Sequence, residues 1–274
     1  MYLEFFGLAR KPFSKTPDPA FLFPSRQHAE ALARLSHAVE EREIAVLTGE
    51  VGAGKTTLSR ALVDEFAERC RFSFIVNPAL PPAQLLGAIA DGFGLTGLRR
   101  KHETYAALAE RFSALDEAGR FPVVVIDEAQ LLAGRPAFDE LRLLTNLAAD
   151  DRQLVGLILL GQPELRERIR ERGGEPFAQR IGVAYHVGAL DVEETGGYVA
   201  HRLAVAGRTA PLFTPEAIAS LHRHSGGLPR RINQLAANAL LEGFAREAAQ
   251  VGADVVDAAA ADLAAYMGTD LAAR

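Results

Sequence analysis

A glycine-rich turn in the first quarter of the chain constrains its fold more than any other feature. The segment Gly49-Glu50-Val51-Gly52-Ala53-Gly54-Lys55-Thr56 fits the pattern G-x-x-x-x-G-K-[ST]. The apolar run IAVLT (44–48) precedes it, and Leu58, Leu62 and Phe66 recur at helical spacing after it. A strand, a glycine turn and a helix in this order are typical of a loop that wraps a phosphate group.

The residue types in this turn have separate chemical tasks. Glycines let backbone N–H groups turn inward around an anion, and the N-terminus of the following helix favours the same negative charge. We expect Lys55 to place its ammonium group against the β- and γ-phosphates and the Thr56 hydroxyl to coordinate Mg²⁺. The predicted Mg·ATP-binding residues are Gly49, Glu50, Val51, Gly52, Ala53, Gly54, Lys55, Thr56 and Thr57.

An acidic pair follows another apolar run. Asp127 and Glu128 come directly after VVVI (123–126), so a buried strand is expected to deliver both carboxylates to its C-terminal end, where ligands bind in open α/β sheets. We predict that Asp127 holds the Mg²⁺ shell with Thr56, and that Glu128 polarises a water molecule for attack on the γ-phosphorus. The glutamate favours hydrolysis, because a small-molecule kinase would need a substrate hydroxyl at this place.

Apolar runs alternate with helical patterns through the first two thirds of the chain. Besides 44–48, strands are expected at 72–77, 122–127, 154–160 and 183–187. Helices are expected at 26–42, 56–70, 83–93, 103–118 and 136–149. Strands that are apolar throughout and alternate with helices form a parallel sheet covered on both faces. The pattern therefore predicts an α/β fold of the P-loop NTPase class, with a five-stranded parallel sheet in a three-layer αβα core.

After residue 190 the pattern changes to helices alone. Asp191 with Glu194 predicts a capping box, and Thr214 before Pro215 predicts another helix start. We therefore divide the chain into an ATPase core at 1–190 and a small helical lid subdomain at 191–274. The core begins with an arm rich in proline and phenylalanine (1–25), which we expect to pack onto the main body because its aromatic side chains favour burial.

Two polar residues are predicted to contact the nucleotide from other elements. Gln162 follows the apolar run 154–160 closely and is expected to touch the γ-phosphate or the reacting water; a capping turn before Pro163 is the alternative. Arg230 lies in the first turn of a helix expected to begin at Pro229. Since the helix dipole disfavours arginine there, Arg230 indicates a nearby anion. A solvent-exposed cap residue is the alternative, and Arg231 is the weaker candidate.

Arg180 is predicted to act across a subunit boundary. It stands in FAQRIGVAYHV, just before the last strand, and an arginine at a protomer's edge can neutralise charge at a neighbour's γ-phosphate. Four other arginines compete for this role but alternate with acids, as on a solvated helix face: Arg166, Arg168, Arg170 and Arg172. A residue that acts in trans requires a homo-oligomer, which we expect to be a nucleotide-dependent ring or filament.

Composition limits the other function classes. The single Cys70 excludes an intrachain disulfide, and the 7 histidines have no metal-ligand spacing. A net charge of −5 gives no bulk basic surface, so DNA is a less favoured partner. No run approaches the ~18–20 apolar residues of a membrane helix, and the N-terminus lacks the basic start of a signal peptide. We expect no membrane span and a cytoplasmic location, with a peripheral place at the inner membrane as the alternative.

The motifs together resemble one family. In order and spacing, and over about residues 1–265, they are similar to the AAA+ ATPases of the ExeA/GspA type: FGLARKPFSKTPDPAFLF, GEVGAGKTT, VVVIDEAQLL, LLGQPELRERI, FAQRI and SGGLPRRIN. The resemblance implies that the N-terminal segment lies near the adenine. It also implies that Gln162 is sensor 1, Arg180 the trans-acting arginine finger and Arg230 sensor 2.

The resemblance leaves more than one role open. It implies an ATPase that drives assembly or remodelling in a secretion, pilus or exopolysaccharide export system, with proteins of that apparatus as partners. The related TniB-type transposition ATPases imply the alternative of an ATP-dependent DNA-binding regulator. A nucleotide-gated binding module with negligible hydrolysis is disfavoured by Glu128. Many secretion-type members continue into a membrane helix and a peptidoglycan-binding region, neither of which follows Arg274, so we expect a cytoplasmic relative or a shortened form.

Overall fold

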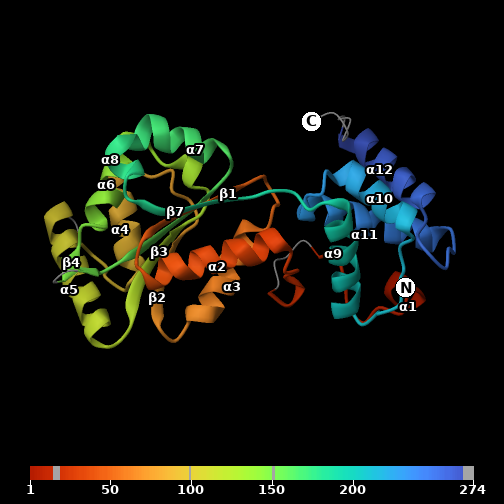
Figure 1. Ribbon diagram of the computed structural model, residues 1–274, viewed down its shortest axis with the longest axis horizontal. Helices are drawn as coiled ribbons and strands as arrows, with labels where there is room; N and C mark the ends of the chain where they lie inside the picture. Colours follow the sequence, from red (N-terminus) through yellow and green to blue (C-terminus); the bar gives the residue numbers. More distant parts are fainter. Residues whose placement is uncertain (15–18, 99, 150–151, 268–274) are drawn as a thin grey trace. The chain divides into compact units, whose positions relative to one another are not determined.

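The computed structural model describes residues 1–14, 19–98, 100–149 and 152–267 (Figure 1). Contacts divide the chain into two compact units. One, here called the α/β unit, comprises Ala29–Gly49 and Leu58–Val187. The other, here called the helical unit, comprises Met1–His28, Glu50–Thr57 and Gly188–Arg274. The glycine-rich loop therefore groups by its contacts with the helices that follow residue 187.

A five-stranded parallel sheet forms the centre of the α/β unit, as predicted. Its strand order is β2-β3-β6-β1-β7. The strands are β1 (Ile44–Gly49), β2 (Cys70–Ile75), β3 (Phe121–Ile126), β6 (Gly156–Gly161) and β7 (Ile181–Val187). Every residue of β1 and β6 is buried, which explains why these segments read as uninterrupted apolar runs.

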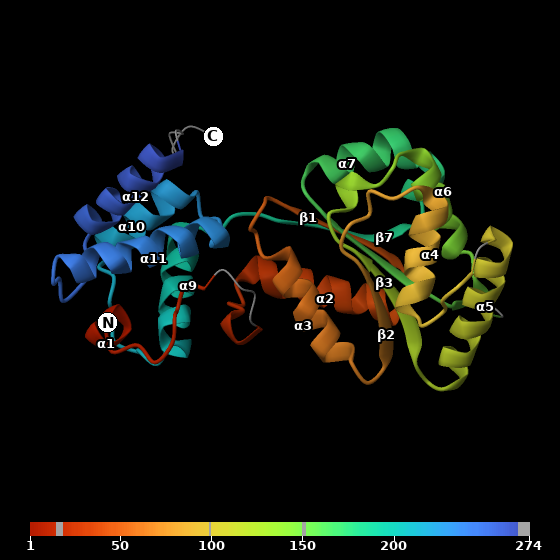
Figure 2. The ribbon, with the colours of Figure 1, turned by 180° about the vertical axis from the view of Figure 1, so that it is seen from behind.

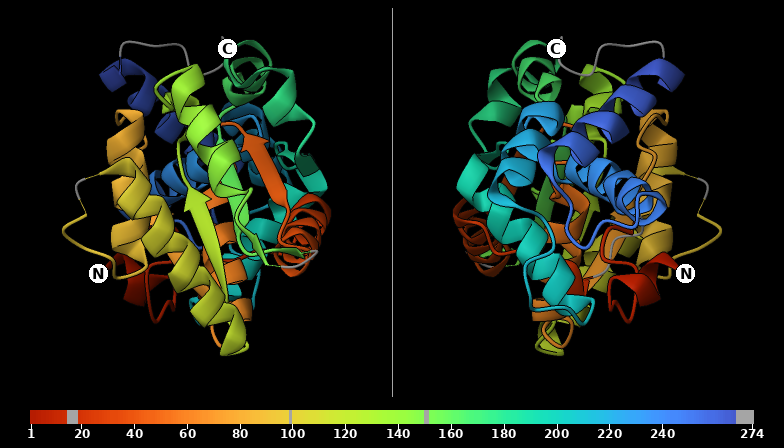
Figure 3. Two further views of the ribbon diagram at one scale, coloured as in Figure 1. Left: turned by 90° about the vertical axis from the view of Figure 1, so that its left-hand side faces the viewer. Right: turned by 90° about the vertical axis from the view of Figure 1, so that its right-hand side faces the viewer.

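Helices cover both faces of this sheet, which confirms the predicted three-layer αβα core (Figures 1 and 3). On one face, Val46, Val124 and Leu157 belong to a buried cluster that includes Leu85 and Phe112. The helices of that face are α4 (Pro82–Gly92), α5 (Lys101–Glu117) and α6 (Arg135–Leu144). The other face is covered by α2 (Arg26–Glu40) and α3 (Lys55–Phe66).

The segment between β6 and β7 differs from the expected pattern. Instead of one solvated helix it contains α7 (Glu164–Arg168), a π-helical turn (Ile169–Gly173) and α8 (Gly174–Ala178). Gly174 has a φ of 68°, a conformation that favours glycine and ends the regular spiral. A short antiparallel pair, β4 (Ala148–Ala149) with β5 (Arg152–Gln153), was also not predicted, since strands of this length leave no period in the sequence.

The helical unit contains α9 (Val192–Val205), α10 (Pro215–Ser225), α11 (Pro229–Ala245) and α12 (Ala253–Met267) (Figure 2). The Asp191 side chain accepts from the Glu194 amide, which confirms the capping box. Thr214 caps α10 by accepting from Ala217, and Gly226 ends it in the left-handed region with a φ of 60°. The termini of these helices thus follow local residue chemistry.

The N-terminal arm begins with α1 (Tyr2–Phe5) and contains a 3-10 turn (Pro19–Phe21). Its packing differs from the prediction: Phe6, Leu8 and Phe13 are buried in one cluster with residues of α9–α12, so the arm belongs to the core of the helical unit. Prolines break the helical period in this segment, so no apolar face indicates which unit the arm packs against. Residues 15–18 of the arm, of which 17 and 18 begin its PDPAFLF motif, lie outside the described residues.

The predicted division at residue 190 stays a prediction, because the contact grouping joins separate segments of the chain instead of cutting it once. Residues 268–274 of the predicted subdomain lie outside the described residues. Within the described part of the chain, no helix combines the length and the apolar character needed to cross a membrane.

Candidate nucleotide site

The glycine-rich loop connects the end of β1 at Gly49 to the start of α3 at Lys55. Gly52 and Gly54 have φ values of 88° and 98°, in the region that favours glycine. The Ala53 amide donates to the Glu50 carbonyl across 3.1 Å, which closes the turn. Lys55 is only 7% exposed, and its Nζ donates to the Glu50 carbonyl across 3.0 Å. The predicted strand–loop–helix arrangement is thus present.

Close contacts also require the two glycines. A Cβ atom on Gly52 would lie 2.4 Å from Cβ of Arg230, and one on Gly54 would lie 2.8 Å from Nε2 of His28. Both distances are below any normal contact of a Cβ atom, so a larger residue would displace the loop or its neighbours. The loop is therefore shaped by two residues that lie far from it in the sequence.

Arg230 is one of these two residues. It lies in the first turn of α11, and its backbone N–H donates to the Gly52 carbonyl across 3.3 Å. Its side chain is exposed. The structure therefore brings Arg230 to the loop and leaves the guanidinium accessible at the start of a helix, while its contact with a nucleotide stays a prediction.

His28 is the other, and it was not among the predicted site residues. It is buried, its Nε2 lies 2.8 Å from the Ala53 carbonyl and its Nδ1 lies 2.7 Å from the Ser25 hydroxyl. Burial lowers the pKa of His28 below its ordinary value. Ser25, three residues earlier at the start of α2, is the signal that could have pointed to a fixed histidine.

The acidic pair lies at the carboxyl edge of the sheet. Asp127 follows β3 and Gln162 follows β6, and the register pairs Ile126 with Leu159, so the two strands end close together. The Glu128 amide donates to Oδ1 of Asp127 across 2.9 Å. The Gln162 side-chain amide donates to Oε2 of Glu128 across 3.2 Å. The structure thus brings together three predicted residues from two strands.

Gln130 completes this group and was missed. Its side-chain amide donates to Oε2 of Glu128, and its Oε1 accepts from the Gln162 backbone N–H across 3.1 Å. It is buried, at 8% exposure. Glu128 itself has a φ of 51°, which is uncommon for a residue other than glycine and is held in place by these contacts. The segment IDEAQ contained the signal, a glutamine two residues after the glutamate.

The predicted arginine finger lies just before β7. Arg180 is exposed, and its NH1 donates to the Thr145 hydroxyl across 3.4 Å. Among its competitors, Arg166 donates through Nε to the Thr48 hydroxyl across 3.2 Å. The Arg180 side chain is thus accessible at the surface of the α/β unit, and its action in trans stays a prediction.

The predicted metal ligands are a hydroxyl and a carboxylate. Thr56 is exposed in the first turn of α3, and Asp127 is half-buried after β3. Both supply hard oxygen atoms, which Mg²⁺ prefers, and Mg²⁺ commonly takes its other ligands from phosphate and water. The donor chemistry therefore fits Mg²⁺.

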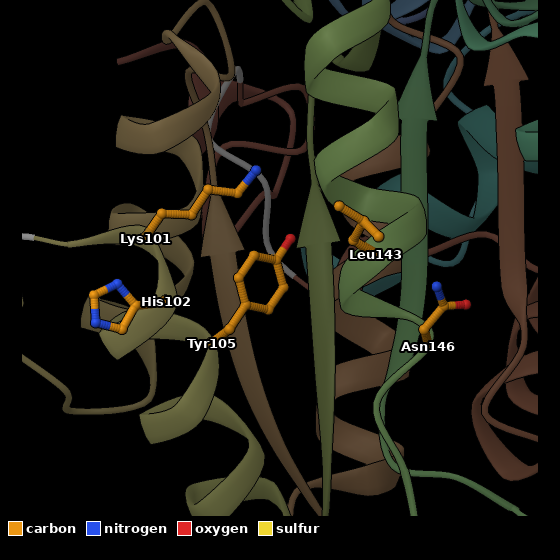
Figure 4. A pocket seen from close by; sticks show the side chains of 5 residues that line it. All are labelled: Lys101, His102, Tyr105, Leu143 and Asn146. Carbon is orange, nitrogen blue, oxygen red and sulfur yellow. The ribbon is translucent and has the colours of Figure 1, made fainter.

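A separate pocket of about 510 Å³ lies between α5 and α6 (Figure 4). It is lined by Lys101, His102, Tyr105, Leu143 and Asn146, none of which was a predicted site residue. Lys101 and the Tyr105 hydroxyl both bond Glu140, so these two polar groups are engaged within the unit.

Comparisons with known proteins agree with this geometry. Residues 37–169 match the family described as AAA domain. General secretion pathway protein A of Aeromonas hydrophila is 42% identical over 253 residues, which cover 90% of this chain and 45% of that protein. The chain thus spans less than half the length of this curated relative.

Solved structures share the fold. The structure of the Aeropyrum pernix ORC2 protein in ADPNP–ADP complexes superposes with a TM-score of 0.69 and 20% sequence identity. The match covers 92% of this chain and 71% of the ORC2 chain. The structure of Drosophila ORC bound to DNA superposes with a TM-score of 0.69 and 18% sequence identity. The match covers 96% of this chain and 68% of the matched ORC chain. At these identities the likeness shows the fold alone.

The parallel sheet, the glycine-rich loop and the match to the AAA domain family lead to one class. The chain is an AAA-type protein with a P-loop NTPase fold of the AAA+ class. Its predicted resemblance to the ExeA/GspA-type AAA+ ATPases is confirmed by the similarity to General secretion pathway protein A.

Proposed function

We propose that this chain is an ATPase that binds Mg·ATP through Gly49–Thr57 and hydrolyses it to ADP and phosphate. The observation that carries the proposal is the position of Lys55, whose ammonium group is buried against the glycine-rich loop at the start of α3. A lysine ammonium held against this loop can donate charge-assisted hydrogen bonds to the phosphates of a nucleotide. The helix N-terminus favours the same anion.

In this proposal Thr56 and Asp127 hold Mg²⁺, which when bound neutralises charge that develops on the phosphates. Glu128 orients and polarises the attacking water, and Gln162 holds the Glu128 carboxylate while its amide contacts the water or the γ-phosphate. Gln130 fixes both residues from one side. The contacts around Glu128 support this arrangement because they place its carboxylate among amide donors at the carboxyl edge of the sheet.

In this proposal two arginines contact the nucleotide, one in its own chain and one in a neighbouring copy. Arg230, whose backbone bonds the loop at Gly52, acts as sensor 2. Arg180 is exposed on the α/β unit and completes the site of a neighbouring copy in trans. This requires a homo-oligomer, a ring or filament that forms with nucleotide bound.

The biological role follows the stronger sequence similarity. General secretion pathway protein A is 42% identical over the aligned residues, so we propose work on assembly or remodelling in a secretion, pilus or exopolysaccharide export system. The proposed location is cytoplasmic or peripheral at the inner membrane. The competing proposal is a DNA-binding regulator of the TniB type, and salt-sensitive DNA binding that ATP strengthens would replace the export proposal.

Calorimetric titration with Mg·ATP tests the central proposal. Lys55→Ala is expected to weaken binding by about 10–100-fold, because a charge-assisted contact to the phosphates is lost. Lys11→Ala is the matched control, since this exposed lysine lies in the N-terminal arm. Equal affinity of the Lys55 variant and the control would overturn the proposed site.

A further inference from the structure

The hydrogen bonds around His28 fix which of its ring nitrogens carries the proton. A carbonyl oxygen can only accept, so Nε2 must donate to the Ala53 carbonyl 2.8 Å away. Nδ1 is then free to accept from the Ser25 hydroxyl, 2.7 Å away. Ser25 also accepts from the His28 backbone N–H across 3.3 Å. The Ala53 carbonyl therefore sets the tautomer, and the serine directly before α2 helps to hold the direction of the ring.

The carbonyl that His28 holds determines the direction of a loop amide. In a trans peptide the C=O and N–H groups point in opposite directions, and no cis peptide occurs among the described residues. Because the Ala53 carbonyl points to His28, the Gly54 N–H points away from it. Amide groups of this loop are the groups expected to surround a phosphate. The contact thus orients one donor of the proposed anion site.

The packing leaves the ring no alternative position. His28 is 6% exposed, and a Cβ atom on Gly54 would lie 2.8 Å from Nε2. The absence of a side chain at Gly54 is therefore what admits the imidazole to the loop backbone. All three groups, His28, Ala53 and Gly54, belong to the helical unit.

We propose that His28 is a positioning residue of the phosphate loop: through the Ala53 carbonyl it aims the Gly54 amide at the bound phosphate. This rests on the proposed function. The residue touches neither nucleotide nor water in this account, and it acts by keeping a loop donor in the binding direction before ATP arrives. Its loss therefore affects substrate and transition state alike, which raises KM for ATP and leaves kcat nearly unchanged.

Two amide variants separate this role from simple packing. In His28→Gln the side-chain amide reaches the position of Nε2 and can still donate to Ala53, whereas in His28→Asn the amide reaches only the level of Nδ1. ATP hydrolysis and calorimetric Mg·ATP binding are measured on the full chain. Asparagine is expected to raise KM and Kd by about 3–10-fold, the size of one hydrogen bond, while glutamine stays within about twofold of the original protein.

Equal values for the two variants would overturn the proposal, as would a loss confined to kcat. If His28→Asn does not fold, Ser25→Ala carries the test, because it keeps the imidazole but removes the side-chain contact that holds its direction. A rise in KM of about twofold or more then supports the proposal, and an unchanged KM overturns it. Lys55→Ala distinguishes the two levels of failure. If it abolishes binding while His28→Asn does not weaken it, only the role of His28 fails; if it binds as the original protein does, the site itself fails.

Discussion

The side-chain amide of Gln162 donates to Oε2 of Glu128 across 3.2 Å, so the residue that follows β6 holds the residue that follows β3. Gln130 donates to the same oxygen and accepts from the Gln162 backbone. The three side chains form a closed hydrogen-bonded group around one carboxylate. A connected group of hydrogen bonds fixes a geometry more firmly than its separate bonds would.

Removing Gln130 is expected to affect hydrolysis more than binding. Gln130→Met keeps the length of the side chain. It removes the acceptor of the Gln162 backbone N–H and one of the donors to Oε2 of Glu128. We expect kcat for ATP hydrolysis to fall by about tenfold or more and the free energy of unfolding to fall by about 1–3 kcal/mol. Calorimetric Mg·ATP affinity should change little. The control is Gln153→Met, at an exposed residue of β5, and equal kcat values for both variants would contradict the role of Gln130.

Arg180 is expected to act on a neighbouring copy. Arg180→Ala should lose ATPase activity by about 10³-fold, the lower end of the effect of an arginine finger. Mixed with Lys55→Ala, it should regain activity, because a mixed assembly contains an intact loop next to an intact arginine. Arg170→Ala, at an exposed arginine of the same segment, serves as the control. Activity measured against the mixing ratio checks this, and no recovery at any ratio would count against action in trans.

Arg202 is expected to anchor the N-terminal arm. It is buried, its Nε donates to the Pro12 carbonyl across 2.6 Å, and its guanidinium lies 4.5 Å from the centroid of the Phe21 ring. Arg202→Lys removes the planar fork that makes these contacts together, so the free energy of unfolding should fall by about 1–3 kcal/mol.

Urea unfolding checks the Arg202 prediction. Arg246→Lys is the matched control, because Arg246 pairs with Glu242 and Asp254 at the surface, where ion pairs contribute about 0–1 kcal/mol. A loss for Arg202→Lys no larger than for the control would show that the arm is held by its apolar side chains alone.

Stability should depend on pH through His28. Burial lowers its pKa in the folded protein, while the hydrogen bond to the Ala53 carbonyl and the charge of Glu194 act in the other direction. The unfolded chain therefore takes up a proton first as the pH falls below about 6.5, and this favours unfolding. The contribution is fully present above about 6.5 and is lost toward the lowered folded pKa.

Urea unfolding of the original protein and of His28→Gln at about pH 7.5 and pH 5.5 measures this contribution. The variant should lose less stability on acidification than the original protein. Burial also lowers the pKa of His201. His201→Gln therefore serves as a comparison, because it removes only the contribution of His201 to the pH dependence of stability. An identical pH dependence of the original protein and His28→Gln would contradict the buried, neutral state of His28.

Elements with a strong local signal could be predicted from the sequence. The strands that became β1, β3 and β6 are apolar throughout because both faces of the sheet are covered, and the caps at Asp191 and Thr214 depend on adjacent residues. The rule that parallel strands end at one edge explains why Gln162 lies beside the acidic pair, although its bond to Glu128 was not itself predicted.

The missed residues depend on contacts between distant segments. His28 lies 25 residues from the carbonyl it bonds, and no period or motif in a single sequence marks such a pair. Gln130 lies next to a recognised motif, but its buried amide becomes informative only when Gln162 is placed beside it. The arm was expected to pack onto the main body but packs with α9–α12. Aromatic residues among prolines indicate that their side chains are buried, but not which unit buries them.

ATP turnover by Glu128→Gln tests the central claim most directly. The amide keeps the size of the side chain but cannot polarise a water molecule, so the variant is expected to bind Mg·ATP with near-original affinity and to hydrolyse it about 10²–10⁴-fold more slowly. Turnover equal to that of the original protein, with binding intact, would contradict the assignment of Glu128 and with it the proposed hydrolytic site.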